Sequence, residues 1–392
     1  MALPLPPREK PKAGLPLIVG AGPAGLTTAL MLSREKAAVR IIDRNAAPAA
    51  ESRALLVNHH TLDLLRDTGV SEKLLAAGNK VRSMKLTIGG HERARLGFDF
   101  ISHPNRFLLL VPQNVTEALL ADSLRELGIV VERRTEFVAA RMDPKGLGAE
   151  IDLRTGGAME TTRVSWLVGA DGAHSAVRKA LGIEFPGAAY EYDWSLVDIK
   201  LGPDIEQDCM ELCLARGAPF LARLPLGNGK HRIIANDPAV EELIPDEWEA
   251  GQVFWRSAFK VSHRMTDRRL VGRAALIGDA AHIHSPAGGR GMNLGIEDGV
   301  TLANLIRETT VIDPALMNKE MEEAMRTRFR QWERERLARA RATLAISDRL
   351  QAIAATQSAM KLLVMPWALR LINLLPSVKR EVLALLADAR QP

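Results

Sequence analysis

The chain has 392 residues, of which 47% are hydrophobic and 25% are charged, and its formal net charge at pH 7 is +5. This length predicts two or three domains with a sizeable core, and the composition is typical of a globular protein. The modest charge and the 4% aromatic content do not favour nucleic-acid binding, which needs a basic surface with aromatic stacking platforms.

The N-terminal part of the chain predicts a strand, a glycine-rich turn and a helix. Residues 1–12 are rich in proline and lysine without an apolar signal core, so we expect a loosely attached leader. Residues 15–19 then predict a buried strand, and residues 26–33 a helix. The turn between them reads Gly20-Ala-Gly22-Pro-Ala-Gly25. In a dinucleotide-binding βαβ unit, these glycines make a tight turn, admit the pyrophosphate and allow close helix packing, respectively.

A second strand, residues 39–42, ends at Asp43 and Arg44. An acid at the end of this strand can accept hydrogen bonds from the adenosine ribose, and Arg44 could neutralise phosphate. Because a strand precedes the glycines, a helix follows them and an acid closes the second strand, the pattern predicts dinucleotide binding rather than a chance spacing.

The next elements are read from periodicity and turn residues. We expect an amphipathic helix over residues 62–75, strands within 81–100 joined by a turn at Gly89-Gly90, a buried strand over 107–111, a helix over 116–127 that Gly128 caps, and a strand over 129–132. A further strand ends at Asp171-Gly172, and Ser175 is the predicted N-cap of a short helix that carries Arg178.

Residues 182–264 have little helical periodicity, and strands are expected over 195–201, 220–224 and 231–234. Alternation separates Phe220 from Arg223, so either could line a pocket but not both on one face. Five residues of this region are candidates for acid–base chemistry or, equally, ordinary structural residues: Tyr190, Tyr192, Arg216, Arg223 and His263. No general base is assigned. Cys209 and Cys213 form no CxxC motif, which favours ordinary packing and a reducing, cytoplasmic compartment.

A third glycine-rich segment follows a strand over residues 274–277. The strand runs into Gly278-Asp279, where the acid suits a ribose or ribityl hydroxyl. A loop with Gly288, Gly289 and Gly291 then leads to a helix that begins near Met292. Such a helix start favours negative charge. The pair His282 and His284 lacks further metal ligands, so no metal site is predicted.

From about residue 311 the chain is expected to be helical. Residues 326–341 carry many arginines interleaved with glutamates, which predicts a solvated helix face. Residues 360–375 are very apolar but contain Pro366, Arg370 and Asn373, so they are too short and too interrupted to cross a bilayer. Core packing or a subunit contact is expected for them, with a membrane surface as the alternative.

Three segments together resemble the group A FAD-dependent monooxygenases of the para-hydroxybenzoate hydroxylase fold, in their short, single-component form: the Gly20–Gly25 turn, the segment from Asp171 to Arg178, and the segment from Gly278 to Asn293. The resemblance spans about 300 residues and has the motifs in family order. It implies an α/β fold in which a Rossmann-like FAD-binding domain is interrupted by a mostly β substrate domain and followed by C-terminal helices. The implied boundaries are 1–80, 106–182 and 268–310 for FAD binding, 81–105 and 183–267 for the substrate sheet, and 311–392 for the helices.

The resemblance also implies an activity. FAD, held non-covalently, would take electrons from NADH or NADPH, react with O2 and hydroxylate an aromatic or polyketide-like substrate through a flavin C4a-hydroperoxide. A Baeyer–Villiger or epoxidising variant, a reductase of the same fold and a flavin-binding protein without turnover are the alternatives. A homodimer is possible.

Several residue roles follow from the resemblance alone. The backbone N–H groups of Met292 and Asn293 would face the flavin, and Pro286 would present its carbonyl to the substrate. Gln113 and Arg53 match positions that contact the phosphate and ribose region of the cofactor. Arg290 stands where glutamine is more usual. It could bind an anionic substrate or nicotinamide phosphate, or point into solvent. Gly299 replaces a common alanine, which we read as a packing change.

Overall fold

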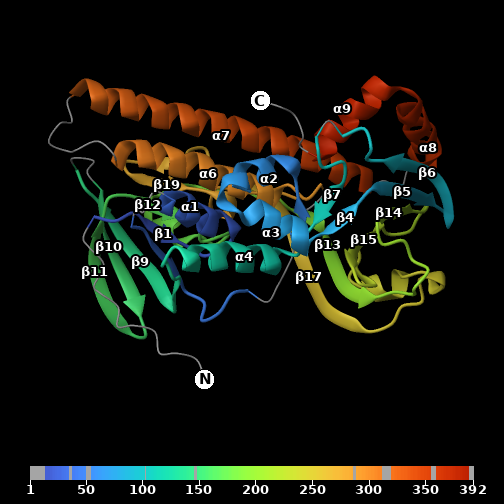
Figure 1. Ribbon diagram of the computed structural model, residues 1–392, viewed down its shortest axis with the longest axis horizontal. Helices are drawn as coiled ribbons and strands as arrows, with labels where there is room; N and C mark the ends of the chain where they lie inside the picture. The colour runs from blue at the N-terminus through green and yellow to red at the C-terminus, as the bar shows by residue number, and fades with distance from the viewer. Residues whose placement is uncertain are drawn as a thin grey trace.

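The computed structural model describes residues 14–34, 38–49, 54–101, 103–144, 148–285, 288–310, 319–354 and 359–387. The predicted leader lies outside these residues. The chain forms an α/β core at one end and a large antiparallel-rich sheet at the other, and helices run along one side (Figure 1). This architecture confirms the fold class expected from the sequence.

A six-stranded sheet forms the centre of the α/β core. Its strands, in spatial order, are β18 (Leu270–Val271), β19 (Ala274–Leu276), β12 (Leu167–Gly169), β1 (Leu17–Val19), β2 (Arg40–Asp43) and β8 (Glu132–Arg133). All neighbouring pairs are parallel except β18 with β19. The carboxyl ends of parallel strands share one edge, so the turns that follow β1, β12 and β19 meet there.

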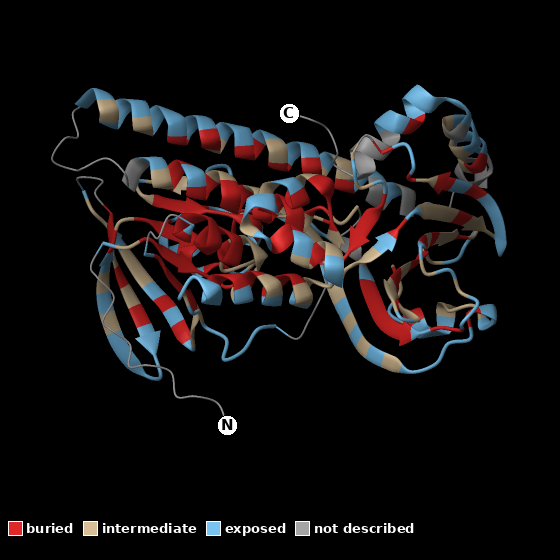
Figure 2. Ribbon diagram, viewed as in Figure 1, coloured by how far each residue is buried: buried red, intermediate tan, exposed pale blue. Residues whose placement is uncertain are grey.

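The central sheet is covered on both faces. Ile18 packs into a cluster with α1 (Pro23–Ser33) and α6 (Gly291–Thr310), whereas Leu17 and Val19 pack on the other face. That second face carries a three-stranded antiparallel sheet made of β9 (Thr135–Met142), β10 (Ala149–Thr155) and β11 (Ala158–Val164). Buried residues accordingly concentrate in the central sheet and its helices (Figure 2).

The large sheet joins two segments that lie far apart in sequence. Its eight strands, in spatial order, are β20 (His282–Ile283), β17 (Val253–Met265), β13 (Gly187–Lys200), β16 (Lys230–Ala235), β15 (Leu221–Gly227), β14 (Cys209–Leu214), β5 (Ser83–Ile88) and β6 (His91–Gly97). The parallel pairing of β14 with β5 connects the two segments. The strands expected within residues 81–100 and 182–264 are therefore confirmed, including the turn at Gly89 and Gly90, which both have positive φ.

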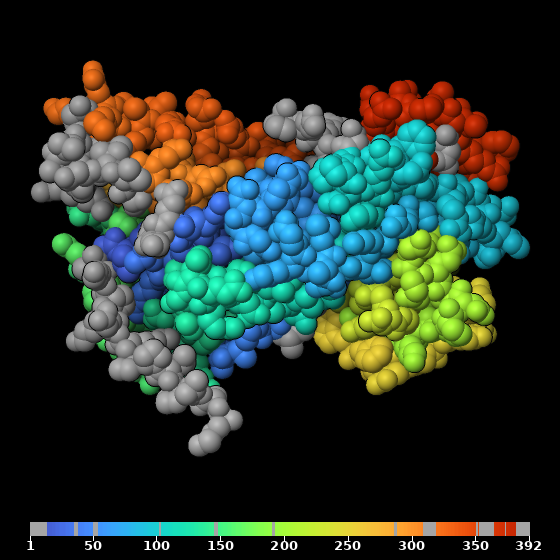
Figure 3. Space-filling model, viewed as in Figure 1, coloured from blue at the N-terminus to red at the C-terminus, as the bar shows by residue number. Residues whose placement is uncertain are grey.

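The remaining elements surround these sheets. They are β3 (Leu56–Val57), β4 (Asn79–Val81) and β7 (Leu108–Leu110), which form a small sheet, and α2 (His59–Leu65), α3 (Val70–Ala77), α4 (Gln113–Glu126), α5 (Ala176–Ala180), α7 (Lys319–Ala354), α8 (Ala359–Leu374) and α9 (Pro376–Ala387). The surface of α8 and α9 lies beside that of the β5–β6 hairpin (Figure 3), and α8 packs on β6. No helix of the described ranges is both long and apolar enough to cross a membrane.

Three sequence-based predictions need correction. The helix expected over residues 62–75 is two helices, α2 and α3. A 3₁₀ turn at residues 66–68 follows α2, and Gly69, with φ +73°, separates that turn from α3. The strand expected over 129–132 starts only at Glu132. The solvated face expected for residues 326–341 holds for most of α7, but Arg336 is buried because it pairs with two acids of α6.

Candidate active site

A cavity of about 690 Å³ lies between the carboxyl edge of the central sheet and the inner face of the large sheet. One side, which we call the turn wall, consists of residues 22–24, 170, 172, 278–279 and 288–292. The opposite side, which we call the sheet wall, consists of Met84, Trp194, Met210, Leu212, Phe220, Ala222, Leu224, Ile234, Phe259 and Val261. Residues of the Gly20–Gly25 turn, of the Asp171–Arg178 segment and of the Gly278–Asn293 segment thus line one cavity.

The first glycine turn has the geometry that the fingerprint requires. Gly20 has φ +104°, and a Cβ there would lie 2.3 Å from the Ala170 oxygen. A Cβ on Gly25 would lie 1.9 Å from the Gly20 oxygen, so only glycine permits this close packing. A Cβ on Gly22 would meet nothing within 4 Å, and no described side chain caps the start of α1. Open space beside uncapped N–H groups fits a pyrophosphate.

Asp43 ties the end of β2 to this turn. Its Oδ2 accepts a hydrogen bond from the Ala21 amide at 2.8 Å, and its Oδ1 accepts one from the Asn45 amide at 2.8 Å. A carboxylate accepts about four hydrogen bonds, so capacity remains for a ribose hydroxyl. Arg44 is exposed to solvent beside it. Asp43 therefore sits where the sequence places a ribose contact, and the contact itself remains a proposal.

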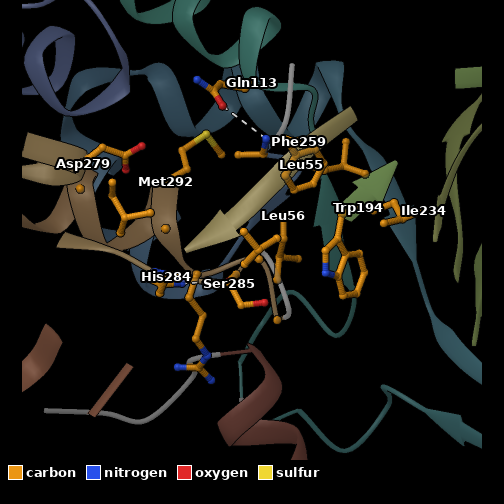
Figure 4. A pocket seen from close by; sticks show the side chains of 18 of the residues that line it. Leu55, Leu56, Gln113, Trp194, Ile234, Phe259, Asp279, His284, Ser285 and Met292 are labelled. Carbon is orange, nitrogen blue, oxygen red and sulfur yellow. Dashed lines mark hydrogen bonds between the residues drawn. The ribbon is translucent and has the colours of Figure 1, made fainter. Parts of the chain in front are cut away.

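Gln113 begins α4 and lines the cavity. Its Oε1 accepts a hydrogen bond from the Ala54 amide at 3.3 Å (Figure 4), and its Nε2 donates to Glu117 at 2.9 Å. These bonds hold the Gln113 side chain at the cavity edge. Arg53 and Pro286, the other contacts implied by the resemblance, lie outside the described residues.

The second motif holds two turns together. Asp171 accepts hydrogen bonds from the Ser175 hydroxyl at 2.5 Å and from the Ala176 amide at 2.6 Å, and Ser175 caps α5 as predicted. Arg178 then donates to the Ala280 carbonyl at 2.9 Å. This last bond links the Asp171 segment to the Gly278 turn. Asp171 itself does not line the cavity, so its position favours a structural role, namely holding the start of α5.

The third motif forms the longest part of the turn wall. Gly278, Asp279 and Ala280 form a 3₁₀ turn, and the Asp279 side chain is exposed at the cavity. A Cβ on Gly289 would lie 2.7 Å from Leu56, so this loop also packs closely. The helix α6 begins at Gly291, as predicted to within a residue.

The start of α6 leaves backbone donors at the cavity. The first helical hydrogen bond runs from the Leu294 amide to the Arg290 carbonyl, so the N–H groups of Gly291, Met292 and Asn293 precede the helical ladder. Met292 lines the cavity. These donors fit the electron-rich edge of a bound flavin, in the place expected from the sequence.

The side chain of Asn293 is engaged within the protein. Its Oδ1 accepts hydrogen bonds from the Asn58 amide and the Thr61 hydroxyl at 2.9 and 2.8 Å. Its Nδ2 donates to the carbonyls of Leu56 and Gly289, both at 2.8 Å. The Asn293 side chain therefore fixes the glycine loop to the small sheet and to α2.

Asp298 lies at the centre of a buried charge cluster that sequence reasoning missed. Its oxygens accept hydrogen bonds from Arg269 at 2.9 Å, from Arg336 at 2.7 Å and from the Gly278 amide at 3.2 Å, and His282 Nε2 lies 2.8 Å away. Burial by itself would raise the pKa of Asp298, but the surrounding cations hold it well below its ordinary value. The only sequence signal is an acid inside an apolar helix.

None of the five acid–base candidates whose side chain the structure describes lines the cavity. Arg223 is buried on the outer face of the large sheet, where it pairs with Glu211 at 3.2 Å, whereas Phe220 lines the cavity, as alternation allows. Arg216 is exposed, His263 does not line the cavity, and the side chains of Tyr190 and Tyr192 lie outside the description.

Two basic side chains lie on the glycine loop instead. Arg290 is buried and lines the cavity, so the solvent-pointing alternative is wrong. Burial lowers the pKa of His284 to about 4, so this cavity-lining imidazole is neutral at pH 7. Within the described residues, no group of three His, Cys, Asp or Glu side chains could hold a metal ion.

Comparison with known proteins places this geometry in a family. The family model described as "FAD binding domain" matches residues 16–242 and 235–347. The chain is 35% identical to 6-methylpretetramide 4-monooxygenase of Streptomyces rimosus over 73% of this chain and 54% of that protein. The chain spans 54–66% of the length of the first three curated relatives that it matches.

Solved structures agree with the fold. The OxyS anhydrotetracycline hydroxylase from Streptomyces rimosus superposes with a TM-score of 0.74 at 27% identity and covers 96% of this chain and 77% of its own. The p-nitrophenol 4-monooxygenase PnpA from Pseudomonas putida DLL-E4 has a TM-score of 0.80 at 17% identity, with 97% and 99% coverage, which supports the fold alone. With the three motifs gathered at one cavity, this chain belongs to the FAD binding domain family, and FAD is its cofactor.

Proposed function

We propose that the chain is an FAD-dependent monooxygenase that uses NADH or NADPH and O2 to hydroxylate an aromatic or polyketide-like organic compound. The observation that carries this proposal is the cavity itself, in which the FAD-binding turns face an apolar sheet wall across about 690 Å³. Relatives named as monooxygenases and hydroxylases of such compounds support it.

When bound, FAD supplies the electron transfer to O2 that protein side chains cannot perform. The protein's share is binding, orientation and exclusion of water. In this proposal Gly20, Gly22 and Gly25 admit the pyrophosphate, Asp43 and Asp279 hold the sugar and ribityl hydroxyls, and the N–H groups at the start of α6 stabilise negative charge on the flavin. The sheet wall keeps water from the reacting carbon.

The wider organisation is proposed on the same basis. FAD binding would occupy residues 1–80, 106–182 and 268–310, the substrate sheet 81–105 and 183–267, and the helical segment 311–392. Cys209 and Cys213 are free, which suits the cytoplasm. The helix α8 exposes Trp367, Leu371 and Leu374, and a homodimer that buries this face is the assembly we propose. Sedimentation of the purified chain tests the dimer.

The activity is tested by substrate-dependent consumption of NAD(P)H and O2. Purified, FAD-loaded protein is mixed with a panel of phenolic and polycyclic compounds, and both rates are followed together with product formation. A substrate should raise both rates and yield a product one oxygen atom heavier. Full NAD(P)H-dependent conversion of an unsaturated compound under strict anaerobiosis, to a product two hydrogen atoms heavier, would establish the reductase alternative instead.

A further inference from the structure

Trp194 occupies the centre of the sheet wall. It lies on β13, opposite Phe259 of β17, and its ring centroid is 5.9 Å from that of Phe220. Its side chain is only 3% exposed and lines the cavity. Because two aromatic neighbours flank it, the indole has a fixed place in the wall rather than a free surface position.

The indole N–H of Trp194 has no hydrogen-bond partner within the described part of the chain, although its Nε1 is buried. Leaving a buried donor unpaired is unfavourable, and tryptophan residues inside proteins usually find an acceptor. In Figure 4 the nitrogen edge of the ring faces the interior of the pocket, toward the side where Leu56 and Ser285 are drawn. The donor therefore lies at the edge of the cavity, covered by neighbouring atoms.

The rest of the sheet wall is apolar, although Lys260 and Ser262 of the neighbouring strand β17 also line the cavity. The cavity-lining side chains of β5, β14, β15 and β16 are methionine, leucine, alanine and isoleucine, without a side-chain nitrogen or oxygen. The charged lining residues Asp279 and Arg290 belong to the turn wall, and Lys260 is exposed on β17. An isolated anion placed against the apolar side chains of β5, β14, β15 and β16 would lose its hydration without compensation.

We propose that Trp194 is a positioning residue that donates its indole N–H to an acceptor oxygen of the substrate, and that the sheet wall selects uncharged ring compounds carrying such an oxygen. This inference rests on the proposed monooxygenase function and names the class of substrate for it. Because Nε1 is buried here, the oxygen must replace atoms now packed against it, so binding is accompanied by a local side-chain shift.

The test uses FAD-loaded protein and three probes: 1-tetralone, tetralin and 4-hydroxybenzoate. Dissociation constants are read from the change in flavin absorbance. Trp194→Phe removes the donor but keeps an aromatic ring. Trp166→Phe is the matched control, because Trp166 is also buried with an unpartnered Nε1 among the described residues but stacks on Phe329 and does not line the cavity.

We expect Trp194→Phe to weaken 1-tetralone binding about five- to tenfold, the effect of one neutral hydrogen bond, and to change tetralin binding less than about twofold. Trp166→Phe should change neither. Equal loss for both probes, or no loss for the ketone, would overturn the positioning role. Tighter binding of 4-hydroxybenzoate than of 1-tetralone would overturn the proposed selectivity for uncharged compounds.

Wild-type protein tests the idea without any variant. After correction for their partition between water and octanol, 1-tetralone should bind more tightly than tetralin, and equal affinities would refute the hydrogen bond. Absence of NAD(P)H-dependent turnover would count against the monooxygenase proposal only, because these binding measurements need no turnover.

Discussion

The turn wall and the sheet wall enclose the same cavity but are built from different parts of the chain. The turn wall presents backbone: glycines with positive φ at residues 172, 278, 288 and 289, and the start of α6, whose first N–H groups precede the helical ladder. The sheet wall presents side chains that alternate along strands, with Trp194 and Phe259 facing the cavity. Backbone geometry suits a cofactor of fixed shape, whereas side chains can vary with the substrate.

A buried charge cluster lies behind each wall, and the two clusters contact different parts of the protein. Asp298 binds the Gly278 amide directly, so its cluster sets the position of a cofactor loop. The Arg223–Glu211 pair lies on the outer face of the large sheet, away from the cavity. Disturbing Asp298 should therefore affect both stability and FAD, and the following predictions test this difference from the largest effect to the smallest.

Asp298→Asn should have the largest effect. The variant keeps the shape of the side chain but leaves Arg269 and Arg336 buried without their shared anion. We expect the free energy of unfolding to fall by about 3–5 kcal/mol, as measured by chemical denaturation. Asp122→Asn is the control, because its pair with Arg125 is exposed and should contribute less than about 1 kcal/mol. Similar losses in both variants would remove the special role of Asp298.

Acid should destabilise the chain through its neutral buried histidines. Burial lowers the pKa of His231 and of His284 from 6.5 to about 4. The unfolded chain therefore takes up protons that the folded chain does not, and the free energy of unfolding falls as the pH drops from 6.5 toward 4. Each histidine contributes at most about 1.4 kcal/mol per pH unit.

Urea denaturation at several pH values checks this dependence. His231 lies behind the sheet wall, whereas His284 lines the cavity, so His231→Gln should flatten the slope without changing FAD content. An unchanged slope in this variant would show that His231 does not carry the effect.

Gly22→Val should remove FAD while leaving the fold intact. A Cβ at this position meets no protein atom within 4 Å, so the new side chain would occupy the space assigned to the pyrophosphate. We expect FAD affinity to fall by about 3 kcal/mol, by analogy with overpacked sites, as read from flavin fluorescence titration. Gly22→Ala should cause a smaller loss. Unchanged FAD affinity in the valine variant would contradict the assignment of this turn.

Asp279→Ala should weaken FAD binding by a smaller amount. The carboxylate faces the cavity, and its loss would leave a ligand hydroxyl unpaired at a cost of about 1–3 kcal/mol. Asp267→Ala, at an exposed loop position, is the control. Equal FAD affinity in both variants would exclude Asp279 from the binding site.

The sequence by itself determined the turn wall. A Cβ on Gly20, Gly25 or Gly289 would lie less than 3 Å from neighbouring atoms, so glycine is required at these three positions. Alternation likewise separated Phe220 from Arg223, because successive side chains of a strand point to opposite faces.

Only the tertiary structure decided which distant residues meet. The Asp298 cluster joins residues 29 and 38 positions apart, and neither spacing has a periodic signal. The sequence predicts that Arg336 lies on a solvated helix face, but the packing of α7 against α6 buries it beside Asp298. The unpartnered N–H of Trp194 is equally invisible in sequence, because whether a donor finds an acceptor depends on every element packed around it. Local backbone requirements can be read from neighbouring residues in the sequence, whereas contacts between residues far apart in sequence depend on how the elements pack.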